Sequence, residues 1–159
     1  MHDFTISCTV NGETIKRTIS PTMTLAGFLR EVLGLTGTKI GCNLGRCGSC
    51  TVLLDGKPVN SCIVLAPQAH GHAIVTIEGL AKNGILNDLQ QTFIDEGAVQ
   101  CGYCTPGMII SAEYLLRTVP LPTEEEIKNA IAGNLCRCTG YVKIIHAIQK
   151  ASEKRHSPD

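Results

Sequence analysis

The chain has 159 residues, and its fourteen basic side chains are balanced by fourteen acidic ones, so the formal net charge is zero. This balance points to neither a nucleic-acid partner nor a membrane partner. The length allows one large domain or two small ones, with a core that forms without disulfides. Nine cysteines are many for a soluble chain, and their odd number argues against a closed disulfide framework, so metal binding is the simpler use for them.

The start of the chain shows no targeting signal. Residues 1–5 lack the basic and apolar regions of a secretory signal peptide. No later run approaches the roughly eighteen apolar residues of a membrane-spanning helix. We therefore expect a soluble protein of the reducing cytoplasm with no membrane partner.

The first predicted elements are two strands joined by a tight turn. Residues 5–10 alternate between apolar and polar side chains, and residues 13–19 follow directly after Asn11-Gly12, a pair typical of two-residue hairpin turns. Cys8 lies within this alternation and outside every cysteine group. Its placement favours a buried apolar role over a role as a metal ligand.

A helix is predicted next, with Thr24 as its N-cap and Gly34 as its stop. Its apolar positions recur at helical spacing, and they are Leu25, Phe28, Leu29, Val32 and Leu33. Beyond the following loop, three more strands are predicted over residues 51–54, 59–65 and 73–77. The strands and the helix together predict a small α+β domain.

The loop between this helix and the later strands is rich in cysteine and glycine, and it reads GCNLGRCGSC over residues 41–50. Its cysteines and one further along the chain have the spacing C-x4-C-x2-C…C, typical of plant-type proteins that hold a [2Fe–2S] cluster through four thiolates. They are Cys42, Cys47, Cys50 and Cys62. Glycines let the backbone wrap closely and turn N–H groups towards a negatively charged cluster. A structural zinc site or paired disulfides are alternatives, but zinc ligands usually come as two short pairs.

From about Leu80 the hydrophobic period changes from two to 3.6 residues, which predicts a domain boundary between residues 1–79 and 80–159. Four helices are expected in the second part, and they cover residues 86–94, 108–116, 123–132 and 142–151. Thr123 and Glu126 form a capping box for the third. Four short helices with short links predict a helical bundle.

Four more cysteines form two pairs ahead of predicted helices: Cys101 and Cys104 before the second, Cys136 and Cys138 before the fourth. Thr105-Pro106 is typical of an N-cap with a first-position proline, and Thr139 is the N-cap expected for the fourth helix, so each pair lies just ahead of a helix start. Helix N-termini favour an anionic centre, so the two pairs could bring four thiolates to one site. The spacing alone also allows zinc, and the iron–sulfur site predicted upstream favours a second iron–sulfur centre. No histidine lies beside a pair, which argues against a Rieske-type centre.

Two motifs around these cysteines resemble signatures of the iron–sulfur subunit of the molybdenum hydroxylases, a family that includes xanthine dehydrogenase, aldehyde oxidoreductase and aerobic carbon monoxide dehydrogenase. They are QCGYCTPG at residues 100–107 and GNLCRCTGY at residues 133–141, and TGTK at residues 36–39 is similar too. The resemblance covers about residues 5–148. The sequence departs from the common pattern at Asn87-Asp88, where relatives commonly show His-Pro, and at Ser49, where they often show alanine.

The resemblance implies an N-terminal β-grasp, plant-type ferredoxin-like domain followed by an all-α four-helix-bundle domain, each holding one [2Fe–2S] cluster. The implied ligands are Cys42, Cys47, Cys50 and Cys62 in the first domain and Cys101, Cys104, Cys136 and Cys138 in the second. Molybdopterin would reside on a large partner subunit and FAD on a medium one, in a heterotrimer that could dimerise. Gln100 and Cys138 would approach the molybdopterin.

The functional expectation is electron transfer. No dinucleotide or triphosphate motif and no nucleophile–base pattern is present in the sequence, so the chain offers no substrate site of its own. The resemblance implies an oxidoreductase subunit that relays electrons from molybdopterin through two clusters to FAD. General similarity favours a xanthine (purine) dehydrogenase, while aldehyde, carbon monoxide and N-heterocycle dehydrogenases are alternatives. A free two-cluster ferredoxin or a zinc-stabilised interaction module are rivals from other classes.

Overall fold

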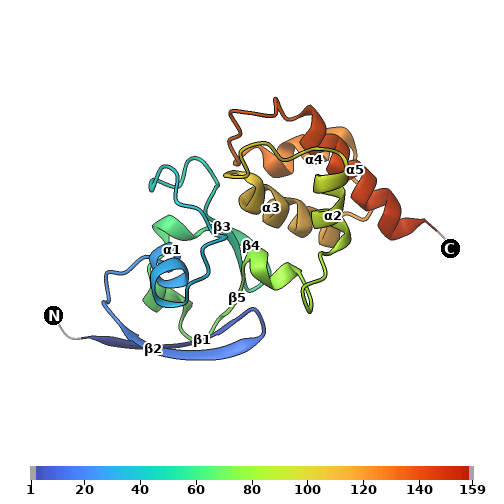
Figure 1. Cartoon of the computed structure of the whole chain (residues 1–159). Coiled ribbons are helices and arrows are strands. Elements are labelled where there is room, and N and C mark those ends of the chain that lie inside the picture. The colour runs from blue at the N-terminus through green and yellow to red at the C-terminus, as the bar shows by residue number, and fades with distance from the viewer. Residues whose placement is uncertain (1–2, 158–159) are drawn as a thin grey trace.

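A computed structural model describes residues 3–157, so the outermost residues of the two predicted domains, 1–2 and 158–159, lie outside the described part of the chain. A β-sheet with a short helix on one face is followed by a group of four helices (Figure 1). The predicted order of an α+β ferredoxin-like part and a helical part is confirmed. The division of the chain at residue 79 stays a prediction.

Five strands form one mixed sheet in the order β2-β1-β5-β3-β4. Their bounds are β1 Phe4–Val10, β2 Glu13–Ile19, β3 Thr51–Leu54, β4 Lys57–Asn60 and β5 Ala73–Val75. Strand β5 runs parallel to β1, and the other pairs are antiparallel. The hairpin between β1 and β2 is confirmed, because Asn11 and Gly12 both adopt the positive φ angles of a two-residue turn.

The strand predicted over residues 59–65 is wrong in extent. Strand β4 ends at Asn60, and a single helical turn, Ser61–Ile63, replaces the rest. This turn carries Cys62 away from the edge of the sheet and buries it at 4% exposure. The Ser61 hydroxyl donates a 2.6 Å hydrogen bond to the Cys50 carbonyl and secures the turn.

The helix predicted after the first hairpin is present, and it covers one face of the sheet. Helix α1 (Leu25–Gly27) continues as a wider, π-type turn over Phe28–Val32, and the Thr24 hydroxyl accepts the Gly27 N–H at 3.1 Å. The apolar side chains of this helix pack against the sheet and form a core with it. The fully buried members of that core include Ile6, Leu25, Phe28, Leu29, Val52 and Ile74.

The four predicted helices of the second part are confirmed. They are α2 Asp88–Asp95, α3 Thr105–Thr118, α4 Glu124–Ile131 and α5 Val142–His156. Capping boxes open α2, through Asn87 and Gln90, and α4, through Thr123 and Glu126. Helix α2 begins two residues later than predicted because Asn87 is its N-cap.

Strand β3 joins the two parts because its side chains alternate between two cores. Val52 belongs to the core under α1, whereas Leu53 belongs to the core formed by the four helices, and both are fully buried. Val75 and Ile77 also pack against the helical core. Helix α3 lies on the side of the helical part that faces β3 (Figure 1). The sheet is therefore covered on both faces.

An ion cluster ties the end of α5 to α2 and α3. The Arg155 guanidinium donates to Asp88, and its Nη2 lies 2.8 Å from Asp88 Oδ1 and 2.7 Å from Glu113 Oε2. Glu113 is only 6% exposed and also accepts from Arg117 Nε at 2.9 Å. Burial works to raise the pKa of Asp88, but the hydrogen bond and charge of Arg155 outweigh it and hold that pKa below its usual value.

We expect Arg155→Met to lower the free energy of unfolding by about 2 kcal/mol at neutral pH, because the buried Glu113 carboxylate loses one of its two cationic partners. The pKa of Asp88 is lower in the folded protein than in the unfolded chain. Its ionised carboxylate therefore contributes fully to the free energy of unfolding above the unfolded pKa of about 3.9, and this contribution is lost as pH falls through the lower folded pKa. Urea unfolding of both proteins from neutral pH to about pH 3 should therefore show the difference shrinking in acid.

The matched control is Lys128→Met, which removes an ion pair between two half-exposed side chains, Lys128 and Glu124. Solvent screens this pair, so we expect no measurable change in stability. If the difference in the free energy of unfolding between wild type and Arg155→Met stays constant down to about pH 3, the assignment of the pH dependence to Asp88 is wrong.

Candidate metal centres

Eight of the nine cysteines lie in pairs, and the pairs form two groups. In the first group Cys42 neighbours Cys47, and Cys50 neighbours Cys62. In the second group Cys104 neighbours Cys136, and the Sγ atoms of Cys101 and Cys138 are 3.5 Å apart. The ninth, Cys8, is buried in β1 away from both groups, as predicted. All nine are free thiols.

This arrangement by twos suits a two-iron cluster. In a four-cysteine [2Fe–2S] centre, two protein thiolates bind each iron and bridging sulfides complete its coordination. A structural zinc ion instead needs four protein ligands around a single point. Among residues 3–157, no three or more His, Cys, Asp or Glu side chains converge on one point in that way. The pairing of the thiols by twos therefore fits [2Fe–2S] centres.

In the first group, backbone N–H groups surround the sulfur of Cys42. Leu44, Arg46 and Cys47 donate to its Sγ at 3.4, 3.3 and 3.4 Å. These hydrogen bonds favour the thiolate and lower the pKa of Cys42 to about 6. The loop is thus organised around a negatively charged sulfur.

Two glycines make this close wrapping possible. A Cβ atom at Gly41 would lie 2.9 Å from the Cys47 Sγ, so a side chain there would displace the sulfur. Gly45 adopts a φ of +70°, a conformation that side-chain-bearing residues rarely adopt. The role predicted for glycine in this loop is confirmed at both positions.

The second pair of this group is buried. Cys50 and Cys62 are 1% and 4% exposed. Burial raises the pKa of Cys50 to about 11, since the thiolate is poorly solvated there. A thiol with such a pKa becomes a thiolate at neutral pH when a metal ion displaces its proton. This pair would therefore bind iron out of contact with water.

In the second group, Cys136 is the thiolate that hydrogen bonds stabilise. Burial works to raise its pKa, but the hydroxyl of Thr139, at 3.1 Å, and its N–H, at 3.4 Å, outweigh burial and lower the pKa to about 7. The Cys136 N–H donates to the Tyr141 hydroxyl at 2.9 Å. Cys104 is the opposite case, because burial raises its pKa to about 12.

Two helix-capping predictions in this group are wrong. Thr139 does not cap α5, because its hydroxyl and N–H are directed to Cys136 and the N-cap is Tyr141. Thr105 does not cap α3 either, since that helix begins at Thr105 with Cys104 in the N-cap position. Cys104 therefore lies at the N-terminus of α3, where the helix dipole favours negative charge.

The second group presents one edge at the surface. Cys101 and Cys138 are exposed, whereas Cys104 and Cys136 are half-buried. Gln100 is exposed beside Cys101. One pair of thiols is therefore open to a partner molecule, while the other faces the interior. Sequence reasoning did not identify the buried Asn134, which lies between the two groups, although its position inside the second motif was a signal.

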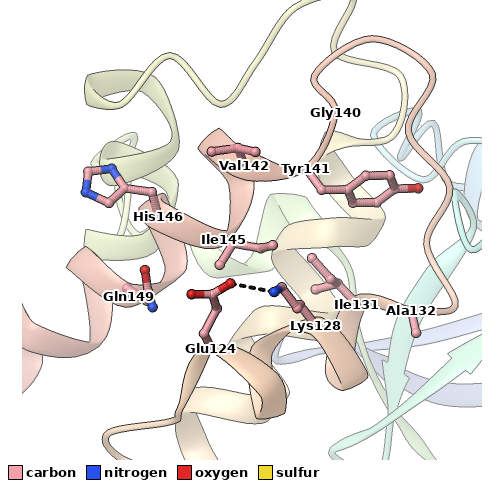
Figure 2. Close-up of a pocket in the computed structure, with 10 residues that line it drawn as sticks. All are labelled: Glu124, Lys128, Ile131, Ala132, Gly140, Tyr141, Val142, Ile145, His146 and Gln149. Carbon is pink, nitrogen blue, oxygen red and sulfur yellow. Dashed lines mark ion pairs between the residues drawn. The ribbon is translucent and has the colours of Figure 1, made fainter.

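A cavity of about 530 Å³ lies between α4 and α5, beside the loop that carries the second group (Figure 2). Its apolar wall includes Ile131 and Ile145, and an ion pair between Lys128 and Glu124 spans 2.5 Å at its edge. Gly140 and Tyr141 connect it to the cysteine loop. None of the eight paired cysteines lines it.

Two family models match the chain and together cover most of it. A "2Fe-2S iron-sulfur cluster binding domain" matches residues 8–73, and a "[2Fe-2S] binding domain" matches residues 76–149. Each match contains one of the two cysteine groups.

Curated relatives and a solved structure resemble the chain over nearly their full length. The nicotinate dehydrogenase small FeS subunit of Eubacterium barkeri is 51% identical over 154 residues, which are 97% of this chain and 98% of the relative. The xanthine dehydrogenase iron-sulfur-binding subunit of Escherichia coli O157:H7 is 48% identical over 91% of both chains. A chain of quinoline 2-oxidoreductase from Pseudomonas putida 86 is 48% identical with a TM-score of 0.94, and the match covers 99% of this chain and all of that chain.

None of the helices within residues 3–157 combines the length and the apolar character needed to cross a bilayer.

Proposed function

This chain belongs to the family of iron–sulfur small subunits of the molybdenum hydroxylases, and we propose that it relays electrons singly from molybdopterin on a large subunit to FAD on a medium subunit. The observation that carries the proposal is the pairing of eight thiols into two four-thiol groups within one chain. The chain would act as a subunit of an oxidoreductase, without a substrate site of its own.

We assign the first cluster to the group of Cys42, Cys47, Cys50 and Cys62, and the second to the group of Cys101, Cys104, Cys136 and Cys138. When bound, each [2Fe–2S] cluster supplies a site that accepts and releases one electron. The chain's own residues supply the thiolates, direct N–H groups at sulfur and keep water from the buried pair of Cys50 and Cys62.

The exposed edge of the second group is the side we assign to the molybdopterin, with Gln100 and Cys138 closest to it. Both residues are solvent-exposed, so a partner can reach them. The first group would then deliver electrons to FAD. We place the assembly in the cytoplasm as a heterotrimer that can dimerise.

For the substrate of the complex we propose a nitrogen heterocycle, with xanthine as the leading compound. The names of the relatives support this class, since they mention nicotinate, xanthine and quinoline. No residue of this chain would contact the substrate, so the test belongs to the purified complex. Assays with xanthine, nicotinate, quinoline, an aldehyde and carbon monoxide separate the classes, and oxidation of an aldehyde or carbon monoxide alone would contradict the proposal.

We expect about four irons and about four acid-labile sulfides per chain, little zinc, and two distinguishable EPR signals after reduction. We also expect the chain to copurify with a molybdenum subunit and a flavin subunit. Two irons per chain with stoichiometric zinc would instead support an interaction module. Isolation as an unaccompanied monomer with full electron-acceptor activity would support a free ferredoxin.

A further inference from the structure

The two cysteine groups are linked through the main chain at one point. The Leu135 N–H donates to the Cys47 carbonyl oxygen at 2.9 Å. Leu135 directly precedes Cys136, so the hydrogen bond joins a cysteine of the first group to the neighbour of a cysteine of the second. A continuous route therefore runs from the Cys47 sulfur along its own main chain, across a single hydrogen bond, and through Leu135 to the Cys136 sulfur.

Glycines allow the main chains to come this close. A Cβ atom at Gly107, in the first turn of α3, would lie 2.3 Å from the Gly48 carbonyl oxygen. A Cβ atom at Gly48 would lie 2.4 Å from the Gly133 carbonyl oxygen. Both distances are far below van der Waals contact. A side chain at Gly48 would therefore push the first cysteine loop away from Gly133, and one at Gly107 would push that loop away from α3.

The buried side chain of Asn134 stabilises the contact between the two cysteine loops through hydrogen bonds. It is 4% exposed, and its Nδ2 donates to the Gly48 carbonyl at 2.9 Å and to the Thr51 hydroxyl at 3.3 Å. Its Oδ1 accepts from the Ser111 hydroxyl at 2.8 Å. One buried side chain thus connects the first cysteine loop, strand β3 and helix α3, next to the residue that donates to Cys47.

We propose that Gly48, Gly107 and Asn134 are positioning residues that set the rate of electron exchange between the two centres, by holding the Cys47 carbonyl against the Leu135 N–H. The inference rests on the proposed electron-transfer function. The step moves one electron, so the centre in the helical part is oxidised while the centre in the ferredoxin-like part is reduced. No bond forms or breaks, and no proton is transferred.

The test compares two alanine substitutions made in the same region. Gly107→Ala places a methyl group against Gly48, and the helical backbone of α3 tolerates alanine well. Gly133→Ala is the matched control, because a Cβ atom there meets nothing within 4 Å. The full chain with both centres oxidised receives a single electron from a radiolytic pulse. Time-resolved absorbance follows the exchange, and freeze-quenched EPR identifies the centre that holds the electron.

We expect exchange to be several-fold slower in Gly107→Ala and unchanged in Gly133→Ala. Iron content and the reduction potentials should remain at their wild-type values in both, since no ligand changes. A residue with only a structural role would alter stability or iron content but not the exchange rate of the intact protein. Equal rates in the two variants, with both centres present, would overturn the proposal.

Asn134→Leu supplies an independent variant. The Gly48 carbonyl keeps its hydrogen bonds from the Thr51 N–H and hydroxyl, at 3.0 and 2.6 Å, so we expect the protein to fold. Exchange should again slow several-fold, whereas Asn129→Leu, on the exposed side of α4, should leave it unchanged. Absence of clusters in the wild-type chain would refute the proposed function. Normal clusters with an unchanged exchange rate in Gly107→Ala and Asn134→Leu would refute only the positioning role proposed here.

Discussion

Serine in place of Cys136 is expected to abolish one of the two [2Fe–2S] EPR signals and leave the other. Cys136 and Cys104 would together bind one iron of the second centre, and serine is a poor replacement for a thiolate ligand. The first group has its own four thiols, so the first cluster should assemble normally. Cys101→Ser should give the same result, because Cys101 neighbours Cys138 in the same group.

The variants should also stop electron flow from molybdenum to flavin in the purified complex. Reduction of the molybdenum site by substrate should persist while flavin reduction is lost, which rapid-mixing absorbance can follow. The matched control is Cys8→Ala. Cys8 is buried at 3% exposure outside both groups, so we expect both EPR signals and a stability loss of about 1 kcal/mol. Loss of both signals in Cys136→Ser would mean that the two sites are not separately housed.

Leu53→Ala is expected to lower the free energy of unfolding by about 3 kcal/mol and to loosen the helical part. Leu53 is fully buried, and it lies on β3 yet packs into the core of the helices. Its removal leaves a cavity at the junction of the two parts, which only partly collapses. Denaturant unfolding followed by far-UV circular dichroism measures the loss, and hydrogen exchange at the amides of α3 should become faster.

The control for this prediction is Ile63→Ala, in the helical turn that follows β4. Ile63 is 62% exposed, so truncation should change stability little. Unchanged exchange in α3 after Leu53→Ala would show that the helical part is stable without the sheet. In that case the shared packing at β3 would contribute only to the ferredoxin-like part.

The departures from the family pattern at Asn87-Asp88 acquire a role in the structure. Asn87 accepts the Gln90 N–H at 2.8 Å as the N-cap of α2, and Asp88 pairs with Arg155 at the end of α5. Sequence analysis could recognise these positions only as unusual. The partner of Asp88 is 67 residues away along the chain, so no local pattern identifies it.

Features encoded by neighbouring residues were correctly predicted. The hairpin turn at Asn11-Gly12, the capping box at Thr123 and the periodicity of the four helices depend on interactions within a few residues. The closeness of Cys42 and Cys47 also follows from the sequence, because both lie in one short loop. The capping prediction failed at Thr139, because its hydroxyl and N–H are directed to the Cys136 sulfur and not to the first turn of α5.

The change of hydrophobic period was therefore sufficient for the order of the two parts, and the resemblance of the cysteine motifs indicated the family. Three other features depend on segments that are distant in the sequence: the side of β3 on which Leu53 lies, the hydrogen bond from Leu135 to Cys47, and the buried bonds of Asn134. Packing between distant surfaces selects among many locally acceptable arrangements, so these contacts emerge only when the whole chain has folded.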